Sequence, residues 1–160
     1  MKILLAIDGS EFSNAAVEEV ANKPWPKGSE VKILSVAEPP ALPVIESWAP
    51  PYDYYEKVEE AAVAQAREAV DKAAARLRKS HDEKLQVSTE VTIGHPRVVI
   101  TDEAEAWGAD LIIVGSHGYR GLTRLWLGSV SQAVASHARC SVEIVRSRKR
   151  ENRSHTRPSL

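Results

Sequence analysis

Short apolar runs that end in turn residues alternate with amphipathic segments along most of this chain, and this alternation constrains the fold more than any other feature. The run KILLAID, residues 2–8, is followed by Gly-Ser, and DLIIV, residues 110–114, is followed by glycine. Runs of this length and composition are typical of strands that are buried on both faces. Further strands are expected at 31–36, 85–93 and 141–145.

Helices are expected between these strands. Ser10 suits the N-cap of the first helix, and a third helix is expected to begin at Pro96 and to end at Gly108, with a fourth over 129–137. A long second helix is predicted over 53–80 because apolar residues recur on one face. These residues are Val58, Ala62, Ala66, Ala69, Ala73 and Leu77. The alternation predicts a doubly wound α/β domain, a five-stranded parallel sheet with helices on both faces.

Composition places limits on the partners and the compartment. The chain has 160 residues, the size of one domain, and 21 basic against 22 acidic side chains give a net charge of -1. Nucleic-acid or membrane binding is therefore not expected, because the protein has no overall field to attract either. A single cysteine, Cys140, and the absence of a leader or a 20-residue apolar stretch point to the cytoplasm. We expect one domain over 1–146 and a disordered basic tail over 147–160.

Four of the eight glycines lie in GSHGYRGLTRLWLGSVS, residues 115–131, directly after an expected strand. Ligands of doubly wound sheets bind beyond the carboxyl ends of the strands, where the winding reverses. Glycine permits positive φ and lets an anion approach backbone N–H groups, and the helix expected to start near Ser129 adds its own N–H groups and dipole. Ser129 and Ser131 add hydroxyl donors. The spacing predicts a phosphate site; a tight turn and a helix start with no ligand remain the alternative.

Other sites are not supported by motifs. The stretch has neither the Lys-Ser/Thr of a P-loop nor the G-x-G-x-x-G spacing of a dinucleotide fold. No carboxylate pair, Ser-His-Asp set, Cys-His set or G-x-S-x-G motif is present, so no catalytic residue is assigned. The five histidines lack metal-ligand spacing, and we expect no protein metal site.

Two segments resemble a known family. ADLIIVGSHGYRGLTRLWLGSVSQAVASHARCSVEIV resembles the C-terminal half of universal stress proteins, and KILLAIDGSEFSNAAVEEV resembles their first strand and helix. The resemblance covers about residues 2–146. The ATP-binding branch carries Gly-x2-Gly-x9-Gly-Ser/Thr, which this chain matches at Gly115, Gly118, Gly128 and Ser129. The resemblance implies a Rossmann-like, adenine nucleotide α-hydrolase-like fold in which the first and fourth strands are neighbours.

The resemblance also implies a binding site for an adenine nucleotide. Asp8 and the main chain near Ala6 and Ile7 are expected on the adenine or ribose side, with Val36 beside the base. The ribose and triphosphate would be surrounded by Val114, Gly115, Gly118, Gly128, Ser129, Val130 and Ser131. Two alternatives stay open, since Asp8 also suits a turn or N-cap and Val36 also suits the core.

From the resemblance we expect a homodimer that binds ATP and acts as a stress sensor or regulator, with at most weak ATPase activity. Mg²⁺ would be carried by the nucleotide, and the partner would be an unknown signalling protein. The dimer would form through the edge strand 141–145. The alternatives are an ATP-hydrolysing or adenylate-transferring enzyme, and a dimeric interaction module whose pocket is empty or holds AMP. ATP is the expected nucleotide, with AMP or ADP as the alternatives.

Two further segments leave their roles open. His117, Arg120 and Arg124 offer a cation to the γ-phosphate or are solvated. The loop over 37–55 is rich in proline and aromatic residues. Three roles are open for it: closing over the base, packing against a partner subunit, or covering the long helix.

Overall fold

The computed structural model describes residues 1–38, 51–81, 85–118 and 127–147. The strands and helices alternate along the chain as the sequence predicts. They are β1 (Lys2–Ala6), α1 (Glu11–Asn22), β2 (Glu30–Ala37), α2 (Tyr52–His81), β3 (Gln86–Ile93), α3 (Pro96–Trp107), β4 (Leu111–Gly115), α4 (Ser129–His137) and β5 (Ser141–Val145).

The five strands form one parallel sheet in the order β3-β2-β1-β4-β5. The chain winds outward from β1 to β3, returns to β4 beside β1, and then continues to β5. At this reversal Ala6 of β1 is paired with Leu34 of β2 on one side and with Val114 of β4 on the other. The predicted doubly wound topology and the expected neighbourhood of the first and fourth strands are both confirmed.

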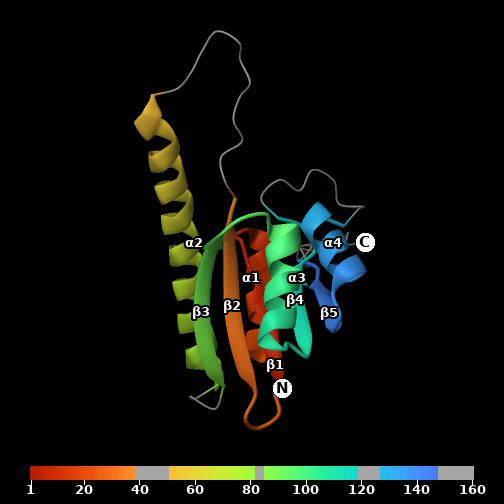
Figure 1. The fold of residues 1–160 in the computed structure, drawn as a ribbon. Helices are drawn as coiled ribbons and strands as arrows, with labels where there is room; N and C mark the ends of the chain where they lie inside the picture. The colour runs from red at the N-terminus through yellow and green to blue at the C-terminus, as the bar shows by residue number, and fades with distance from the viewer. Residues whose placement is uncertain (39–50, 82–84, 119–126, 148–160) are drawn as a thin grey trace, which may run out of the picture.

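Helices cover both faces of the sheet (Figure 1). Ile3 and Leu5 of β1 are fully buried with residues of α1 and α2, whereas Leu4, also fully buried, lies on the opposite face with Ile100 of α3 and Val134 of α4. Because β1 is buried on both faces, its sequence is an unbroken apolar run rather than an alternating one.

The helix ends follow the predicted local chemistry. Ser10 is the N-cap of α1, and its Oγ accepts a hydrogen bond of 3.2 Å from the backbone N–H of Ser13. Pro96 occupies the first turn of α3, and Gly108 ends that helix with φ 70°, in the left-handed region that favours glycine.

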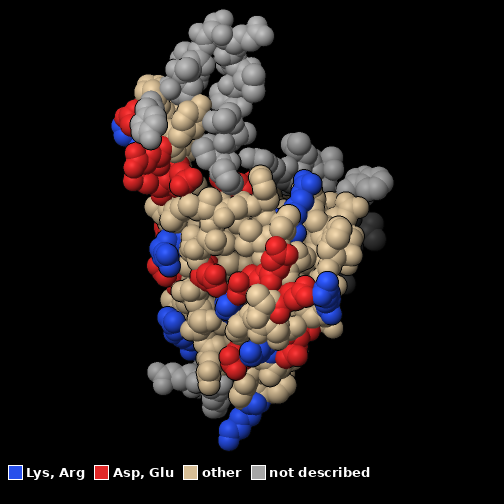
Figure 2. Space-filling model, in the orientation of Figure 1, with Lys and Arg blue, Asp and Glu red and all other residues tan. Residues whose placement is uncertain are grey.

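The predicted long helix is confirmed, since α2 begins at Tyr52, one residue before the expected start at 53. The predicted loop over 37–55 overlapped this start; Tyr54 and Tyr55 are helical, and residues 39–50 of that loop lie outside the described residues. On the predicted face Ala66, Ala73 and Leu77 are buried and Ala69 is partly buried. Val58 and Ala62, nearer the start of the helix, are also only partly buried. The reason is visible in Figure 1, where the first part of α2 extends beyond the sheet. Acidic side chains gather on this projecting part (Figure 2).

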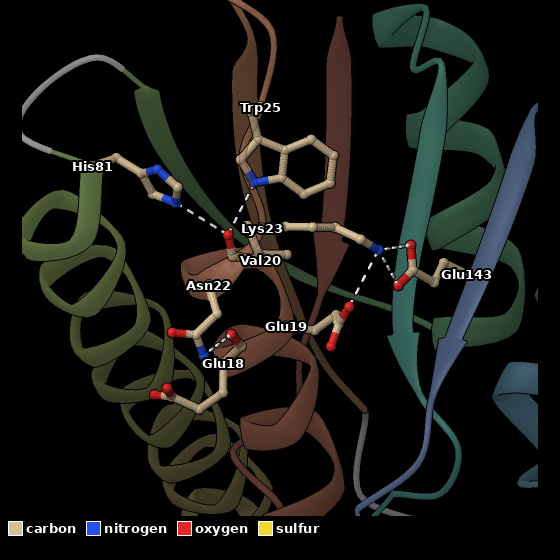
Figure 3. A network of polar contacts seen from close by, with 8 residues as sticks. All are labelled: Glu18, Glu19, Val20, Asn22, Lys23, Trp25, His81 and Glu143. Carbon is tan, nitrogen blue, oxygen red and sulfur yellow. Dashed lines mark hydrogen bonds and ion pairs between the residues drawn. The ribbon is translucent and has the colours of Figure 1, made fainter.

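A polar network holds the C-terminal end of α1 against two other elements (Figure 3). Lys23 Nζ lies 2.6 Å from an Oε atom of Glu143 on β5, and this hydrogen bond raises the pKa of Lys23. The carbonyl oxygen of Val20 accepts hydrogen bonds from Trp25 Nε1 at 2.9 Å and from His81 Nε2 of α2 at 3.1 Å. The edge strand β5 is thus joined to the C-terminal end of α1 by a partly exposed ion pair.

Candidate functional site

A cavity of about 410 Å³ lies at the carboxyl ends of the strands, around the point where the winding reverses between β1 and β4. Its volume is within the range of roughly 300–1,000 Å³ that is usual for small-molecule sites. Open α/β sheets bind ligands at this place because the loops that follow neighbouring strands separate there.

All eleven residues that the sequence analysis assigned to a ligand line this cavity. They come from the ends of β1, β2 and β4 and from the start of α4, and they are Ala6, Ile7, Asp8, Val36, Val114, Gly115, Gly118, Gly128, Ser129, Val130 and Ser131. The structure therefore brings them together, while their contact with a ligand stays a prediction.

The three glycines of the pattern are explained by close approach of neighbouring atoms. A Cβ atom on Gly115 would lie 2.6 Å from the carbonyl oxygen of Phe12, and one on Gly118 would lie 2.7 Å from Asp8 Oδ2. A Cβ on Gly128 would lie 3.1 Å from the Cα of His117. None of the three has a positive φ. Of the two predicted reasons, a positive φ is wrong for these three glycines, and close approach of an anion stays a prediction. Neighbouring atoms leave little space for a Cβ at these positions.

Asp8 holds the turn between β1 and α1. One carboxylate oxygen accepts a hydrogen bond of 3.0 Å from the backbone N–H of Ser10. The same carboxylate faces Gly118, since its other oxygen is the atom that a Cβ there would meet. The turn role of Asp8 is thus confirmed, and the side chain also lines the cavity.

The N-terminus of α4 is directed into the cavity. The backbone N–H of Gly128 donates to the carbonyl of Ser116 at 2.8 Å, and the first helical hydrogen bond runs from Gln132 N–H to Gly128 O at 2.9 Å. The N–H groups of residues 129–131 precede that bond, so the helix provides them with no acceptor. Backbone N–H groups at a helix N-terminus favour an anion such as phosphate.

Ser131 differs from its prediction as a hydroxyl donor to the ligand. Its side chain is buried, and its Oγ donates a hydrogen bond of 2.7 Å to the carbonyl of Gly115. The hydroxyl therefore joins the end of β4 to the start of α4, and only the backbone N–H of Ser131 is left for an anion.

His117 lines the cavity with its ring 5.1 Å from the ring of Phe12, measured between centroids. The Ser116 hydroxyl lies 3.2 Å from His117 Nδ1. Arg120 and Arg124, predicted as alternative phosphate contacts, lie outside the described residues.

The sequence analysis did not assign the remaining residues that line the cavity. Most lie at the end of β2, on α2 and at the start of α3: Leu34, Ser35, Ala37, Glu38, Ala62, Gln65, Ala66, Pro96, Arg97 and Ile100. Ser13 of α1 completes the lining, with His117. Position just after strands β2 and β3 was the available signal for some of them; the alanines of α2 were interpreted as core.

Two absences apply to the described part of the chain. No group of three or more histidine, cysteine, aspartate or glutamate side chains is placed to hold a metal ion among the residues described. No helix within those residues combines the length and apolar character needed to cross a bilayer. Burial raises the pKa of the Cys140 thiol, which favours the protonated form.

Comparison with known sequences shows the family of this chain. The model of the universal stress protein family matches residues 1–146. A universal stress protein of Methanocaldococcus jannaschii is 32% identical over 94% of this chain and 84% of its own length, and one of Bacillus subtilis is 31% identical over 91% and 98%. The match to universal stress protein A homolog 2 of Coxiella burnetii, 39% identical, spans 56% of this chain and only 57% of that relative.

Solved structures of this family share the fold. UspA of Lactobacillus plantarum superposes with a TM-score of 0.74 at 24% identity, covering 91% of this chain and 97% of its own. An Arabidopsis thaliana family member with AMP bound has a TM-score of 0.65 at 18% identity, over 97% of both chains. A universal stress protein in complex with cAMP has a TM-score of 0.65 at 22% identity, over 91% and 96%. With a family match over nearly the whole chain and the same doubly wound sheet, this chain belongs to the universal stress protein family.

Proposed function

We propose that the chain binds an adenine nucleotide, with ATP as its ligand, in the cavity at the reversal between β1 and β4. One observation carries the proposal: residues from four separate segments, selected by the Gly-x2-Gly-x9-Gly-Ser spacing and its associated positions, line a single cavity. Its α4 end has the backbone N–H groups of residues 129–131, which suit phosphates. Asp8, whose carboxylate lies beside Gly118, supplies oxygens that would accept hydrogen bonds from ribose hydroxyl or base amino groups.

The residues present fit such a ligand. A Cβ on Gly118 would occupy space beside the Asp8 carboxylate, so glycine keeps that part of the cavity open. Relatives of the same fold hold AMP and cAMP, which supports an adenine nucleotide as the class of ligand. Mg²⁺ relies largely on phosphate oxygens and water, so it would enter with ATP, and Asp8 is a carboxylate of the cavity lining that it could meet.

We further propose a regulatory rather than a catalytic role. Binding of the nucleotide would change how a cytoplasmic homodimer meets a signalling protein, with slow hydrolysis at most. The dimer would form through β5, an edge strand with one paired side. Sedimentation at micromolar concentration tests this part, and a monomer mass would contradict it.

Calorimetry with ATP, ADP, AMP and cyclic AMP, each with and without Mg²⁺, tests the nucleotide proposal. We expect ATP to bind most tightly and Mg²⁺ to strengthen its binding. No heat of binding with any of the four would refute the proposal. Preference for AMP alone would favour the interaction module, and turnover of about 1 per second or faster would favour an enzyme.

Gly118→Val tests the site itself. The Cβ of the new side chain would lie beside the Asp8 carboxylate and would meet no described backbone atom within 4 Å, so we expect a folded protein that has lost ATP binding. The matched control is Gly121→Val, because Gly121 lies between the pattern positions. Equal ATP affinity in the wild type and Gly118→Val would contradict a phosphate or ribose role for this loop.

A further inference from the structure

The cavity has a second end, away from α4, that the glycine pattern does not describe. It lies over the carboxyl end of β2, where Val36 and Ala37 form part of its lining. Helix α2 borders it with Ala62, Gln65 and Ala66, and α3 borders it with Pro96, Arg97 and Ile100. These two helices pack on opposite faces of the sheet, so this end of the cavity lies between them.

Alanines on one face of α2 form its part of this lining. Ala62 and Ala66 are one helical turn apart and therefore share a face. The same face continues into the core, where Val70 and Leu77 are fully buried. Toward the start of the helix that face loses its cover: Ala66 is buried, Ala62 is partly buried, and Ala61 on the neighbouring face is exposed. The turn from Ala62 to Ala66 is thus the place where α2 leaves the sheet and faces the cavity.

We infer that the Ala62–Ala66 turn of α2 sets the size of the base that the cavity admits. The inference rests on the proposed nucleotide site: with the phosphates at the N-terminus of α4, the base lies at the other end. There the lining consists mainly of apolar or small side chains, Val36, Ala37, Ala62, Ala66 and Ile100, the surroundings that favour burial of an aromatic ring. The methyl group of alanine is the smallest apolar side chain. A larger side chain at position 62 or 66 would therefore occupy part of the cavity that the ring of the base fills.

A graded series at position 62 tests the inference. Ala62 is partly exposed on a helix, so Ala62→Val and Ala62→Leu are compatible with folding, which circular dichroism checks. We expect ATP and adenosine to bind progressively more weakly from alanine to valine to leucine, with a loss of about tenfold or more for leucine, or 1.4 kcal/mol by the conversion of affinity to free energy. Ala61→Leu is the matched control, with the same added atoms on the exposed surface one residue earlier, and should bind ATP like the wild type.

Binding of inorganic tripolyphosphate, which has no base, distinguishes a failure of this inference from a failure of the proposed function. Ala62→Leu should lose adenosine and keep tripolyphosphate, whereas Gly118→Val should weaken ATP and tripolyphosphate together. Ala62→Leu with wild-type affinity for ATP, or with equal losses of adenosine and tripolyphosphate, overturns the role of α2 while leaving the nucleotide site in place. A wild-type protein that binds neither ATP nor adenosine overturns both.

Discussion

Replacing Gly115 with alanine isolates the structural part of the glycine pattern. A Cβ there would lie 2.6 Å from the carbonyl oxygen and 2.7 Å from the carbonyl carbon of Phe12, and 2.9 Å from the backbone nitrogen of Ser13. All three are backbone atoms of the first turn of α1, so they cannot rotate away as a side chain would. Overpacking a buried site costs typically about 1–3 kcal/mol, and we expect the upper part of that range, about 2–3 kcal/mol.

The assay is thermal unfolding followed by circular dichroism. For a chain of this size each kcal/mol lowers Tm by roughly 2–4 °C, so Gly115→Ala should lower Tm by about 4–12 °C. Gly118→Ala is the contrast: among the described residues its Cβ would meet the end of the Asp8 side chain rather than backbone, so Tm should fall less than in Gly115→Ala while ATP binding weakens. An unchanged Tm for Gly115→Ala, or equal losses of stability in the two variants, would refute this account of the spacing.

Two further predictions concern stability. Burial alone would lower the pKa of Lys32. Its hydrogen bonds to Glu103, at 2.5 Å, and to Glu90 outweigh this effect and raise the pKa above 10.5. The ion pair therefore stabilises fully below pH 10.5 and is lost as pH rises through the higher folded-state pKa; urea unfolding should show this alkaline loss, and Glu103→Gln should reduce it. Ser131→Ala leaves the Gly115 carbonyl without its donor and should lower the free energy of unfolding by about 1–3 kcal/mol. Ser136→Ala, at an exposed hydroxyl, is the control in the same urea titration, and equal effects would contradict the prediction.

Much of the fold could be predicted because local patterns and burial agree. The apolar runs of β1 and β4 have no polar interruption because both strands are buried on two faces. Gly108 could be assigned to a helix end because only a residue tolerant of positive φ fits there. The end of the loop before α2 could not be placed in the same way, because Tyr54 and Tyr55 fell within both the predicted helix over 53–80 and the predicted loop over 37–55. The first turns of α2 project beyond the sheet (Figure 1), so burial imposes no apolar period there.

The residues of the candidate site also fall into two groups, those that could be predicted from the sequence and those that could not. Residues next to the glycine pattern could be assigned because strand ends and helix starts place them together by topology. Ala62, Ala66 and Arg97 could not, because their approach to the cavity depends on how α2 and α3 pack against opposite faces of the sheet. From the sequence, an alanine at helical spacing is predicted to lie in the core, whether it packs against a side chain or borders a cavity.

The glycine spacing is therefore a mixed signal, and its parts carry different weight for function. Gly115 is required by the backbone of α1, whether or not a ligand is present, so its place in the pattern reports the fold. Gly128 is constrained in part by the backbone of His117, at 3.1 Å. Gly118 meets only a side chain that itself faces the cavity, so glycine there is needed for open space rather than for packing. A relative that kept Gly115 but carried a large residue in place of Gly118 would be expected to keep the sheet and lose the nucleotide.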